Sequence, residues 1–283
     1  MKDKKEVVKK VCLVTGSSSG LGKEIAKLCC QKGLMVYVTA RREEELLNLK
    51  HECENNGSSG EIHVVAGDLT HAKFRKNLIE FIIKKQGKID YLINNAGYGK
   101  LNAHEDIHLK DIEGMFNLNC IALQDMCRLV LPIMKKQQKA RIINIASVAA
   151  IEPPSYFATY NSTKYAVHGF TKSLSYELAD SNVSVSAVFP PRMNTSFWTI
   201  AFKCKNLGGS EQKTCADEWA KKSTGSLSVA KYVVNHLDSK RLILLPGVLP
   251  KLAYGFLRHF KFIGSFFMKN FQVKKAKEML NSE

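Results

Sequence analysis

The sequence predicts an α/β fold in which helices cover both faces of a parallel sheet of about seven strands. Short runs of apolar and β-branched residues alternate with longer stretches of helical period. The short runs end at Gly, Asp, Ser or Pro, as buried parallel strands do, and a glycine-rich turn follows the first of them. This alternation is typical of a doubly wound, Rossmann-type sheet.

Six runs have the length and composition of buried strands. In chain order they are KVCLVTG, LMVYVTA, IHVVAGD, IDYLINNAG, RIINIAS and VSVSAVFP. A later run, RLILLPG, ends at Gly247 and is expected to add a seventh strand. The helical stretches after the first three strands end at Gly33, Gly57 and Gly87, where glycine favours the left-handed residue that closes a helix.

The sequence pattern changes after Gly247. We therefore expect a catalytic domain over residues 1–247 and a separate amphipathic C-terminal extension over residues 248–283, which is rich in Phe and Lys. That composition is typical of a helix lying on an anionic membrane surface. The alternative is a packing element that covers the substrate cleft or forms a dimer interface. Residues 195–224 are irregular and longer than most loops, which points to a functional segment.

The composition predicts a negatively charged partner. There are 42 Lys and Arg residues against 26 Asp and Glu, a formal net charge of +16, which suits phosphate groups or anionic lipid. No nucleic-acid-binding module accompanies these residues, so no nucleic acid is expected. The eight cysteines show no metal-ligand spacing with histidine, so no metal is predicted and they are interpreted as reduced core residues.

The sequence also predicts the compartment. Its N-terminal stretch, MKDKKEVVKKVCLVTG, has no apolar run of the kind found in a cleaved signal peptide. No run of about 18 uncharged apolar residues occurs anywhere, so no membrane-spanning helix is expected. We expect a cytoplasmic protein, free or peripheral on a membrane surface that faces the cytosol.

The glycine-rich turn, TGSSSGLG, lies after the first strand and opens the first helix. Glycine allows the backbone to turn tightly and approach a pyrophosphate, whose charge is stabilised by the N–H groups at the helix N-terminus. The spacing is GxxxGxG, and its position between a strand and a helix predicts a dinucleotide site. The residues predicted to form it are Gly16, Ser18, Ser19, Gly20, Leu21 and Gly22.

The end of the second strand predicts the type of nicotinamide cofactor. An acidic residue there would bind the adenosine ribose 2′-hydroxyl, whereas this chain has Ala40, Arg41 and Arg42. Arginine favours a 2′-phosphate because its planar head makes charge-assisted bonds to phosphate oxygens. Glu43 is the competing ribose contact, but its position suits the start of a helix. We predict NADP(H), with Arg41 as the main contact and Arg42 solvated.

The pentapeptide YNSTK holds Tyr160 and Lys164 four residues apart, so on a helix the two side chains share a face. Reducing a ketone requires a proton donor, and a tyrosine with a pKa of about 10 is a poor acid–base group at neutral pH. We expect the Lys164 ammonium to lower that pKa by stabilising the phenolate. A lone pair at this spacing is common on helices, so the accompanying motifs decide its meaning.

Six motifs occur in the order seen in the short-chain dehydrogenase/reductase family, which the chain resembles from about Lys10 to Gly247. They are TGSSSGLG, GDLT, NNAG, NLN, INIAS and YNSTK. The resemblance implies a Rossmann-type sheet and a homo-oligomer. It implies catalysis by Asn119, Ser147, Tyr160 and Lys164. It implies further cofactor contacts by Asp68 near the adenine, by Asn94, Ala96 and Gly97 along the cleft, by Met193 and Thr195 beside the carboxamide, and by Tyr160 and Lys164 themselves.

The four catalytic candidates have distinct expected roles. Ser147 donates a hydrogen bond to the carbonyl oxygen as its charge grows, and Asn119 positions a water that returns a proton to Tyr160. Lys164 also binds the nicotinamide ribose. The structural alternatives are that Ser147 caps the following segment and that Asn119 forms a turn. Tyr165, the neighbouring phenol, points about 100° away around the helix.

One departure from the family pattern refines the predicted function. Pro191 stands where the family usually has glycine, and the Pro-Pro pair resembles that of the 3-ketosphinganine reductases. We predict an NADP(H)-dependent oxidoreductase that interconverts a ketone or aldehyde and an alcohol, reducing a lipophilic substrate such as a keto-lipid. The alternatives are an NADP-linked alcohol or hydroxysteroid dehydrogenase acting in the oxidative direction, and a non-catalytic NADP-binding regulatory protein.

Overall fold

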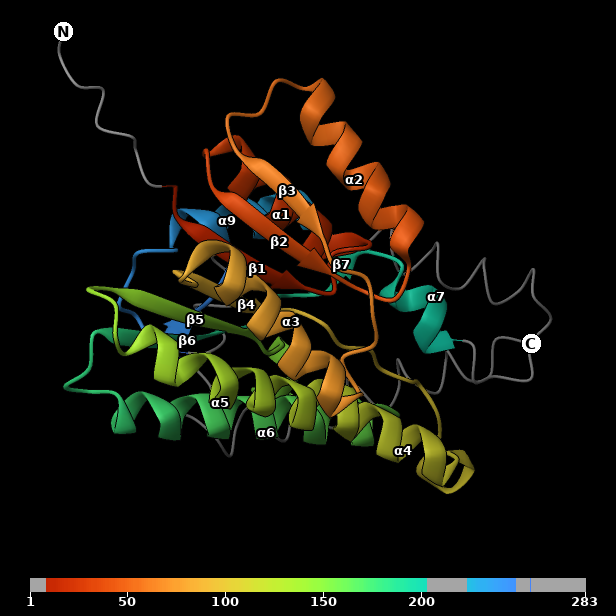
Figure 1. The fold of residues 1–283 in the computed structure, drawn as a ribbon. Helices are drawn as coiled ribbons and strands as arrows, with labels where there is room; N and C mark the ends of the chain where they lie inside the picture. The colour runs from red at the N-terminus through yellow and green to blue at the C-terminus, as the bar shows by residue number, and fades with distance from the viewer. Residues whose placement is uncertain (1–8, 203–222, 248–254, 256–283) are drawn as a thin grey trace, which may run out of the picture.

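The computed structural model describes residues 9–202, 223–247 and 255. A parallel seven-stranded sheet crosses the molecule in the order β3-β2-β1-β4-β5-β6-β9 (Figure 1). Its strands are β1 (Val11–Thr15), β2 (Met35–Thr39), β3 (Glu61–Val64), β4 (Tyr91–Asn94), β5 (Ala140–Ile145), β6 (Val183–Val188) and β9 (Ile243–Leu244). The doubly wound sheet predicted from the sequence is confirmed, and its seventh strand comes from the run that ends at Gly247.

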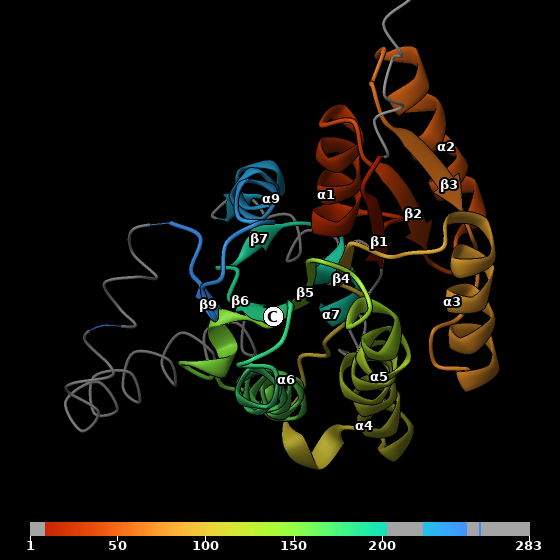
Figure 2. The ribbon, with the colours of Figure 1, turned by 60° about the vertical axis from the view of Figure 1, so that its left-hand side comes forward.

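Helices cover both faces of the sheet (Figure 2). One face carries α1 (Gly20–Gln31), α2 (Glu43–Asn55) and α9 (Ser226–Asn235). The other carries α3 (Ala72–Gln86), α5 (Leu123–Met134) and α6 (Ala158–Glu177). The loops after α1, α2 and α3 contain Gly33, Gly57 and Gly87 at φ +83°, +61° and +70°, which confirms the predicted helix ends.

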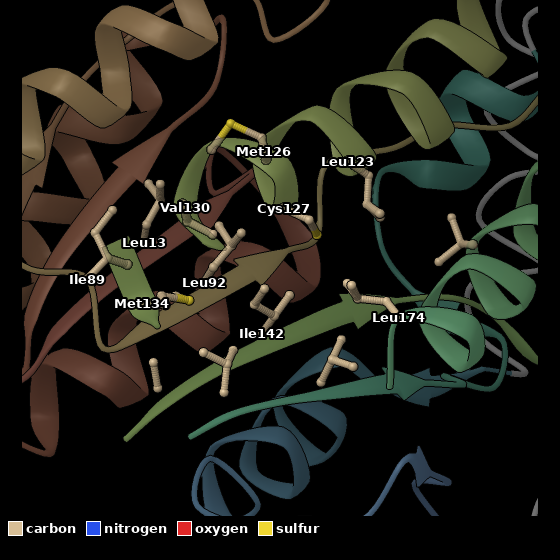
Figure 3. Close-up of a cluster of buried hydrophobic side chains, with 14 of the residues drawn as sticks. Leu13, Ile89, Leu92, Leu123, Met126, Cys127, Val130, Met134, Ile142 and Leu174 are labelled. Carbon is tan, nitrogen blue, oxygen red and sulfur yellow. The ribbon is translucent and has the colours of Figure 1, made fainter. Parts of the chain in front are cut away.

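Two hydrophobic cores lie on the two faces because successive side chains of a strand point to opposite sides. In β1, Leu13 joins the core under α3, α5 and α6, whereas Val14 joins the core under α1, α2 and α9. Figure 3 shows Leu13, Leu92 and Ile142 from three strands facing the helix that carries Val130. Each fully buried side chain of this size contributes about 1.5–3 kcal/mol.

The helix before β5 is not regular. Helix α4 (Leu109–Phe116) passes through a π-helical stretch, Asn117–Ala122, directly into α5. π-Helical turns are rare and are found mostly at functional sites. The sequence did not predict this π-helical stretch, which contains Asn119.

The chain segment after β6 adds a small second sheet. Strand β7 (Met193–Asn194) pairs in parallel with β8 (Thr224–Gly225), and the short helix α7 (Phe197–Phe202) follows β7. The irregular segment predicted at residues 195–224 therefore begins with a helix, and its residues 203–222 lie outside the described chain. The C-terminal extension predicted at 248–283 also lies outside it, apart from Gly255. Among the described helices, none combines the length and apolar character needed to cross a membrane.

The topology creates a crevice at the carboxyl ends of the central strands. The chain starts in β1, fills one side of the sheet through β2 and β3, and then returns to β4 on the other side. The connections that follow β1 and β4 therefore lead to helices on opposite faces of the sheet, α1 on one and α5 on the other. In open parallel sheets this switch point is where ligands bind.

A buried ion pair supports one wall of this crevice. Arg75 on α3 donates from Nε to Oδ2 of Asp125 on α5 at 2.5 Å, and both side chains are largely buried. Its Nη1 donates to the carbonyl oxygens of Leu69 and Thr70 at 2.6 and 3.1 Å. One guanidinium therefore joins two helices to the loop after β3.

We expect the Arg75→Met variant to lose about 1.5–3 kcal/mol of unfolding free energy, because it removes the buried hydrogen bonds of the guanidinium to Asp125, Leu69 and Thr70, although Arg128 still pairs with the Asp125 carboxylate. The neighbouring Lys76 is exposed and pairs only across its own helix surface with Glu80, so Lys76→Met should change stability by less than about 0.5 kcal/mol. Urea unfolding followed by tryptophan fluorescence measures both. Equal small losses for the two variants would contradict a supporting role for Arg75.

Candidate active site

A cavity of about 1220 Å³ lies at the carboxyl ends of the strands. It brings together most of the residues predicted from the sequence. These are Gly16, Ser18, Ser19, Gly20, Leu21, Arg41, Asp68, Ala96, Gly97, Ser147, Tyr160, Lys164, Met193 and Thr195. Three predicted residues, Gly22, Asn94 and Asn119, do not line it.

The glycine-rich turn forms one end of the cavity. Gly16 has φ +70°, and a Cβ atom there would lie 2.7 Å from Cα of Ala96, so a side chain would fill the space between the turn and the loop after β4. Asn95 holds the two together by donating from Nδ2 to the carbonyl oxygens of Thr15 and Gly16 at 3.0 and 3.2 Å. Gly22 lies behind this contact, where a Cβ would clash with the Gly16 carbonyl.

The turn fits the phosphates of a dinucleotide. Glycine at position 16 lets the turn pack directly against the backbone of Ala96, and the turn lines the cavity and leads directly into the N-terminus of α1, where backbone N–H groups favour anions. The two serine side chains of the turn also line the cavity. The residues present are therefore suited to a nicotinamide dinucleotide.

The position of Asn94 corrects a prediction. Its side chain is 3% exposed and donates from Nδ2 to Oδ1 of Asn144 at 2.9 Å. Asn144 in turn donates to Oγ1 of Thr171 on α6 at 3.0 Å. Asn94 is the last residue of β4 and points into the sheet, so the next residue, Asn95, lines the cavity instead.

The adenosine end of the cavity carries two arginines. Arg41 and Arg42 both line it, and Nη2 of Arg42 donates to the hydroxyl oxygens of Ser18 and Ser19, each at 2.9 Å. The prediction that Arg42 is solvated therefore needs correction, because its head is fixed over the glycine-rich turn while the residue stays exposed. The sequence predicted Ser18 and Ser19 as part of the dinucleotide site but did not predict that they would bind Arg42.

Asp68 lies at the same end. Its Oδ1 accepts hydrogen bonds from the N–H and the hydroxyl of Thr70, both at 2.8 Å. Burial raises the pKa of Asp68, but these two bonds and nearby Arg41 outweigh that effect and leave the pKa below its ordinary value. Asp68 is thus an ionised acceptor near the arginines.

Ser147 and Tyr160 meet at the opposite end. Ser147 begins a short 3₁₀ turn, and its Oγ accepts the N–H of Ala149 at 3.1 Å. It also forms a hydrogen bond with the Tyr160 hydroxyl. The capping alternative and the contact with the phenol are therefore both present. Tyr165 points away and donates to the Ile151 carbonyl at 3.2 Å.

Lys164 is buried beside this pair and is 5% exposed. Its Nζ donates to the carbonyl oxygen of Ile145 at 2.9 Å and lies 5.7 Å from the centroid of the Tyr160 ring. Burial lowers the pKa of Lys164 to about 8. No carboxylate in the described part of the chain forms an ion pair with it.

The pKa of Tyr160 differs from the expectation. Burial raises it to about 12, and the opposing effect comes from the hydrogen bond to Ser147. Lys164 does not lower the pKa of Tyr160 in this geometry. Burial lowers the pKa of Lys164 itself, so the ammonium loses its proton at a lower pH than the phenol does. The phenol therefore stays protonated throughout the neutral range.

Asn119 lies behind the cavity and is 1% exposed. Its Nδ2 donates to the carbonyl oxygen of Tyr98 at 2.8 Å and to Oγ1 of Thr163 at 3.0 Å, and its Oδ1 accepts the N–H of Tyr98 at 3.0 Å. Both amide hydrogens are used, so the side chain has no donor left for a water. The contact with Thr163 fixes the helix turn that carries Lys164.

Sequence motifs did not indicate the wall around Tyr160. The rings of Phe157 and Phe197 lie 5.8 and 5.3 Å from its ring, measured between centroids. Trp198 packs against both and donates from Nε1 to the Met193 carbonyl at 2.8 Å. The aromatic residues of 195–224 were the available signal, but no spacing showed which of them face the cavity.

The fold and the site together define an oxidoreductase of the Rossmann type. A glycine-rich turn lies at the switch point of the sheet, and Ser147, Tyr160 and Lys164 converge at the other end of the same cavity. Residues 10–203 match the family model for short chain dehydrogenase, and the chain belongs to this family.

Individual relatives support the same assignment. A 3-ketodihydrosphingosine reductase of Bacteroides thetaiotaomicron is 33% identical over 187 residues, which cover 66% of this chain and 65% of that protein, slightly less than two thirds of its length. The L-sorbose reductase of Gluconobacter frateurii, solved with NADPH and L-sorbose, is 25% identical with a TM-score of 0.73, covering 85% of this chain and 97% of that one.

A third comparison concerns the fold alone. A short chain dehydrogenase/reductase of Burkholderia phymatum, solved in complex with NAD, has a TM-score of 0.78 at 23% identity and covers 89% of this chain and 93% of that one. The sorbose reductase was solved with NADPH and the Burkholderia phymatum protein with NAD.

We expect the Lys164→Met variant to be more stable than the wild type at pH 7. Moving the pKa of Lys164 from 10.5 to about 8 corresponds to about 3 kcal/mol at 1.36 kcal/mol per unit, and the lost bond to Ile145 offsets about 1 of this. A gain of about 2 kcal/mol remains.

The gain should shrink as the pH rises from 8 to 10.5. In this range unfolded Lys164 holds its proton and folded Lys164 does not, so the stability of the wild type rises with pH while that of the variant does not. Denaturant titrations at several pH values measure the difference. Lower stability of the variant at pH 7 would show that burial of the ammonium is not costly.

Proposed function

We propose that this protein is an NADP(H)-dependent reductase of a lipophilic ketone or aldehyde, with a keto-lipid as the preferred substrate class. One observation carries the proposal: a single cavity has Arg41 and Arg42 at one end and the hydrogen-bonded pair of Ser147 and Tyr160 at the other. The first end suits a 2′-phosphate, and the second suits a carbonyl oxygen that gains negative charge.

The residues at the second end supply the proton and orient the carbonyl. The bound nicotinamide supplies the hydride. Ser147 donates its hydroxyl hydrogen bond to the carbonyl oxygen, and Tyr160 transfers its phenolic proton to that oxygen as the alcohol forms. Solvent then returns a proton to the phenolate that remains, and Lys164 would hold the nicotinamide ribose. Asn119 acts indirectly, by fixing the turn of α6 that carries Lys164.

The protonation state of Tyr160 supports the reductive direction. A pKa raised to about 12 keeps the phenol protonated at neutral pH, and a protonated phenol is what carbonyl reduction requires. Alcohol oxidation begins with a base and would need the phenolate.

The wall of the cavity supports a lipophilic substrate. Phe157, Phe197 and Trp198 line it near Tyr160, and Ile200 lines the same cavity. Ile200 is 40% exposed, and so presents an apolar surface to solvent. The name of one relative, 3-ketodihydrosphingosine reductase, is consistent with a long-chain ketone.

Two further parts of the proposal rest on the sequence. The Phe- and Lys-rich residues 248–283 would tether the enzyme to an anionic membrane surface, close to a lipid substrate. The protein would act as a homo-oligomer, as its family resemblance implies. Sedimentation with anionic liposomes and the mass of the protein in solution test these two points separately.

The Tyr160→Phe variant tests the proposed chemistry. It removes the proton that completes reduction but leaves the ring in place, so we expect NADPH-dependent turnover of a long-chain ketone to fall by at least a hundredfold, about 2.7 kcal/mol or more. NADPH affinity, measured by fluorescence, should change less than about threefold. Substantial turnover by the variant would contradict the role of Tyr160. Absence of turnover by the wild type with any carbonyl substrate would favour the regulatory alternative.

The arginines test cofactor choice. Arg41→Asp and Arg42→Ala should each weaken NADPH binding about ten- to a hundredfold, the effect of losing one charge-assisted phosphate contact of about 1.5–3 kcal/mol. Arg41→Asp should also improve NADH binding relative to NADPH. Lys84→Asp, an exposed site near the end of α3, makes the same charge change away from the cavity. Unchanged NADPH affinity in both arginine variants would refute NADP preference.

A further inference from the structure

The Lys164 amine lies in the wall of the cavity, next to the phenol of Tyr160. Its Nζ is 5.7 Å from the centroid of the Tyr160 ring, and both residues line the cavity. Gly97 lines the same part of the wall, and a Cβ atom at Gly97 would lie 3.6 Å from Nζ. Glycine at this position therefore leaves room beside the amine for another molecule.

No carboxylate fixes the Lys164 amine as an ion pair in the part of the chain that the structure describes. Its Nζ donates to the Ile145 carbonyl at 2.9 Å, which uses one of its hydrogens. Two carboxylates, Asp68 and Glu152, line the cavity, but neither is among the groups that shift the pKa of Lys164. The charged form of the amine therefore gains no attraction from an opposite charge.

The groups that face the amine are neutral near pH 7. Burial raises the pKa of the Cys120 thiol, which donates to the Thr163 carbonyl at 3.5 Å, and the pKa of the Tyr160 phenol is raised to about 12. Burial lowers the pKa of Lys164 to about 8. At about pH 7.5 roughly a quarter of the molecules then hold the free amine, against about 0.1% for an exposed lysine with a pKa of about 10.4.

We infer that Lys164 is a covalent modification site for aliphatic aldehydes in the cofactor-free protein. The free amine attacks the carbonyl carbon, a C–N bond forms, and the carbonyl oxygen leaves as water, so that an imine joins Nζ to the alkyl chain. Desolvated lysines in apolar pockets form imines of this kind with carbonyl compounds. The step consumes no oxidant or reductant, and water reverses it.

The cavity offers the alkyl chain of the aldehyde an apolar surface. Phe157, Phe197 and Trp198 line it near Tyr160. The modification goes beyond the proposed reductase function, because imine formation requires neither a cofactor nor hydride transfer. A bound dinucleotide should prevent it, since Lys164 is then expected to hold the nicotinamide ribose. Free enzyme would therefore be sensitive to aldehydes, and cofactor-bound enzyme would be protected.

Reductive trapping locates the modified amine. The full-length protein is incubated near neutral pH with hexanal and cyanoborohydride, which reduces an imine to a stable secondary amine, and peptide mass spectrometry follows each amine over time. The chain's α-amino group, with an ordinary pKa of about 7.7–8.0, is the internal reference. The proteins are the wild type, Lys164→Met and the control Lys172→Met, which removes an exposed lysine from the same helix.

We expect wild-type Lys164 to be labelled at least about tenfold faster than Lys172. NADP⁺ or NAD⁺, at a concentration that calorimetry shows to be saturating, should slow labelling of Lys164 at least about fivefold and change labelling of the α-amino group less than about twofold. Lys172→Met should leave the labelling of Lys164 unchanged, and Lys164→Met should lose the fast lysine label.

Two results would overturn the inference, and both come from the wild type, so they do not depend on the folding of a variant. One is labelling of Lys164 no faster than that of Lys172. The other is labelling of Lys164 that a bound nucleotide leaves unchanged, or slows only as much as it slows the α-amino group.

Turnover of hexanal and of a long-chain ketone with NADPH is measured separately. If the wild type reduces no carbonyl compound, the proposed function is wrong, yet the labelling rates still decide whether Lys164 is the modification site. If the wild type reduces hexanal and Lys164 is not labelled preferentially, the reductase function stands and the modification site is rejected.

Discussion

A lysine ammonium held inside the protein is the constraint on which the arrangement of this site depends. Lys164 lies on the inner face of α6, where the charged form is disfavoured strongly enough to bring its pKa to about 8. Its hydrogen bond to Ile145, the last residue of β5, ties it to the carboxyl edge of the sheet. A shift of α6 along the sheet would break this bond and take the Lys164 ammonium away from the Ile145 carbonyl. The register between α6 and β5 is therefore set by a polar contact as well as by packing.

Other buried polar contacts reinforce that register. Thr163, the neighbour of Lys164, accepts from Asn119 in the π-helical stretch, and Thr171 accepts from Asn144 in β5. Asn144 is itself bonded to Asn94 of β4. The first bond joins two helical segments, the second crosses from α6 into the sheet, and the third joins two strands. An unpaired buried amide would cost about 1–3 kcal/mol, so each partner restricts the others. The consequence for the site is that Tyr160, one turn before Lys164, is carried by a helix with very little freedom to slide.

The sequence predicted the elements whose cause is local and missed those whose cause is tertiary. The seven strands and the glycines after α1, α2 and α3 follow from hydrophobic runs and from the backbone preference of glycine, and all were predicted. Asn94 was predicted to line the cavity, but Asn95 lines it instead, because a motif does not show which residue at a strand end points inward. The interaction of Arg42 with Ser18 and Ser19 joins two loops. The raised pKa of Tyr160 depends on its partial burial in the folded chain, which no spacing reveals. Glu152 and Phe197 belong to no motif and became recognisable only through the cavity that they share.

The two ends of the cavity use charge in different ways, and the difference follows from exposure. Arg42 is exposed, and its two bonds to serine hydroxyls are bonds to neutral acceptors. Exchanging them for bonds to a phosphate replaces neutral acceptors by a charged one, which makes stronger hydrogen bonds. The serine bonds therefore hold the guanidinium near the place where a phosphate would bind, at little cost when they are given up. At the other end the charged group of Lys164 is buried, and burial lowers its pKa to about 8. The exposed guanidinium of Arg42 can therefore exchange one set of partners for another, whereas the buried Lys164 cannot move without losing its hydrogen bond to the Ile145 carbonyl.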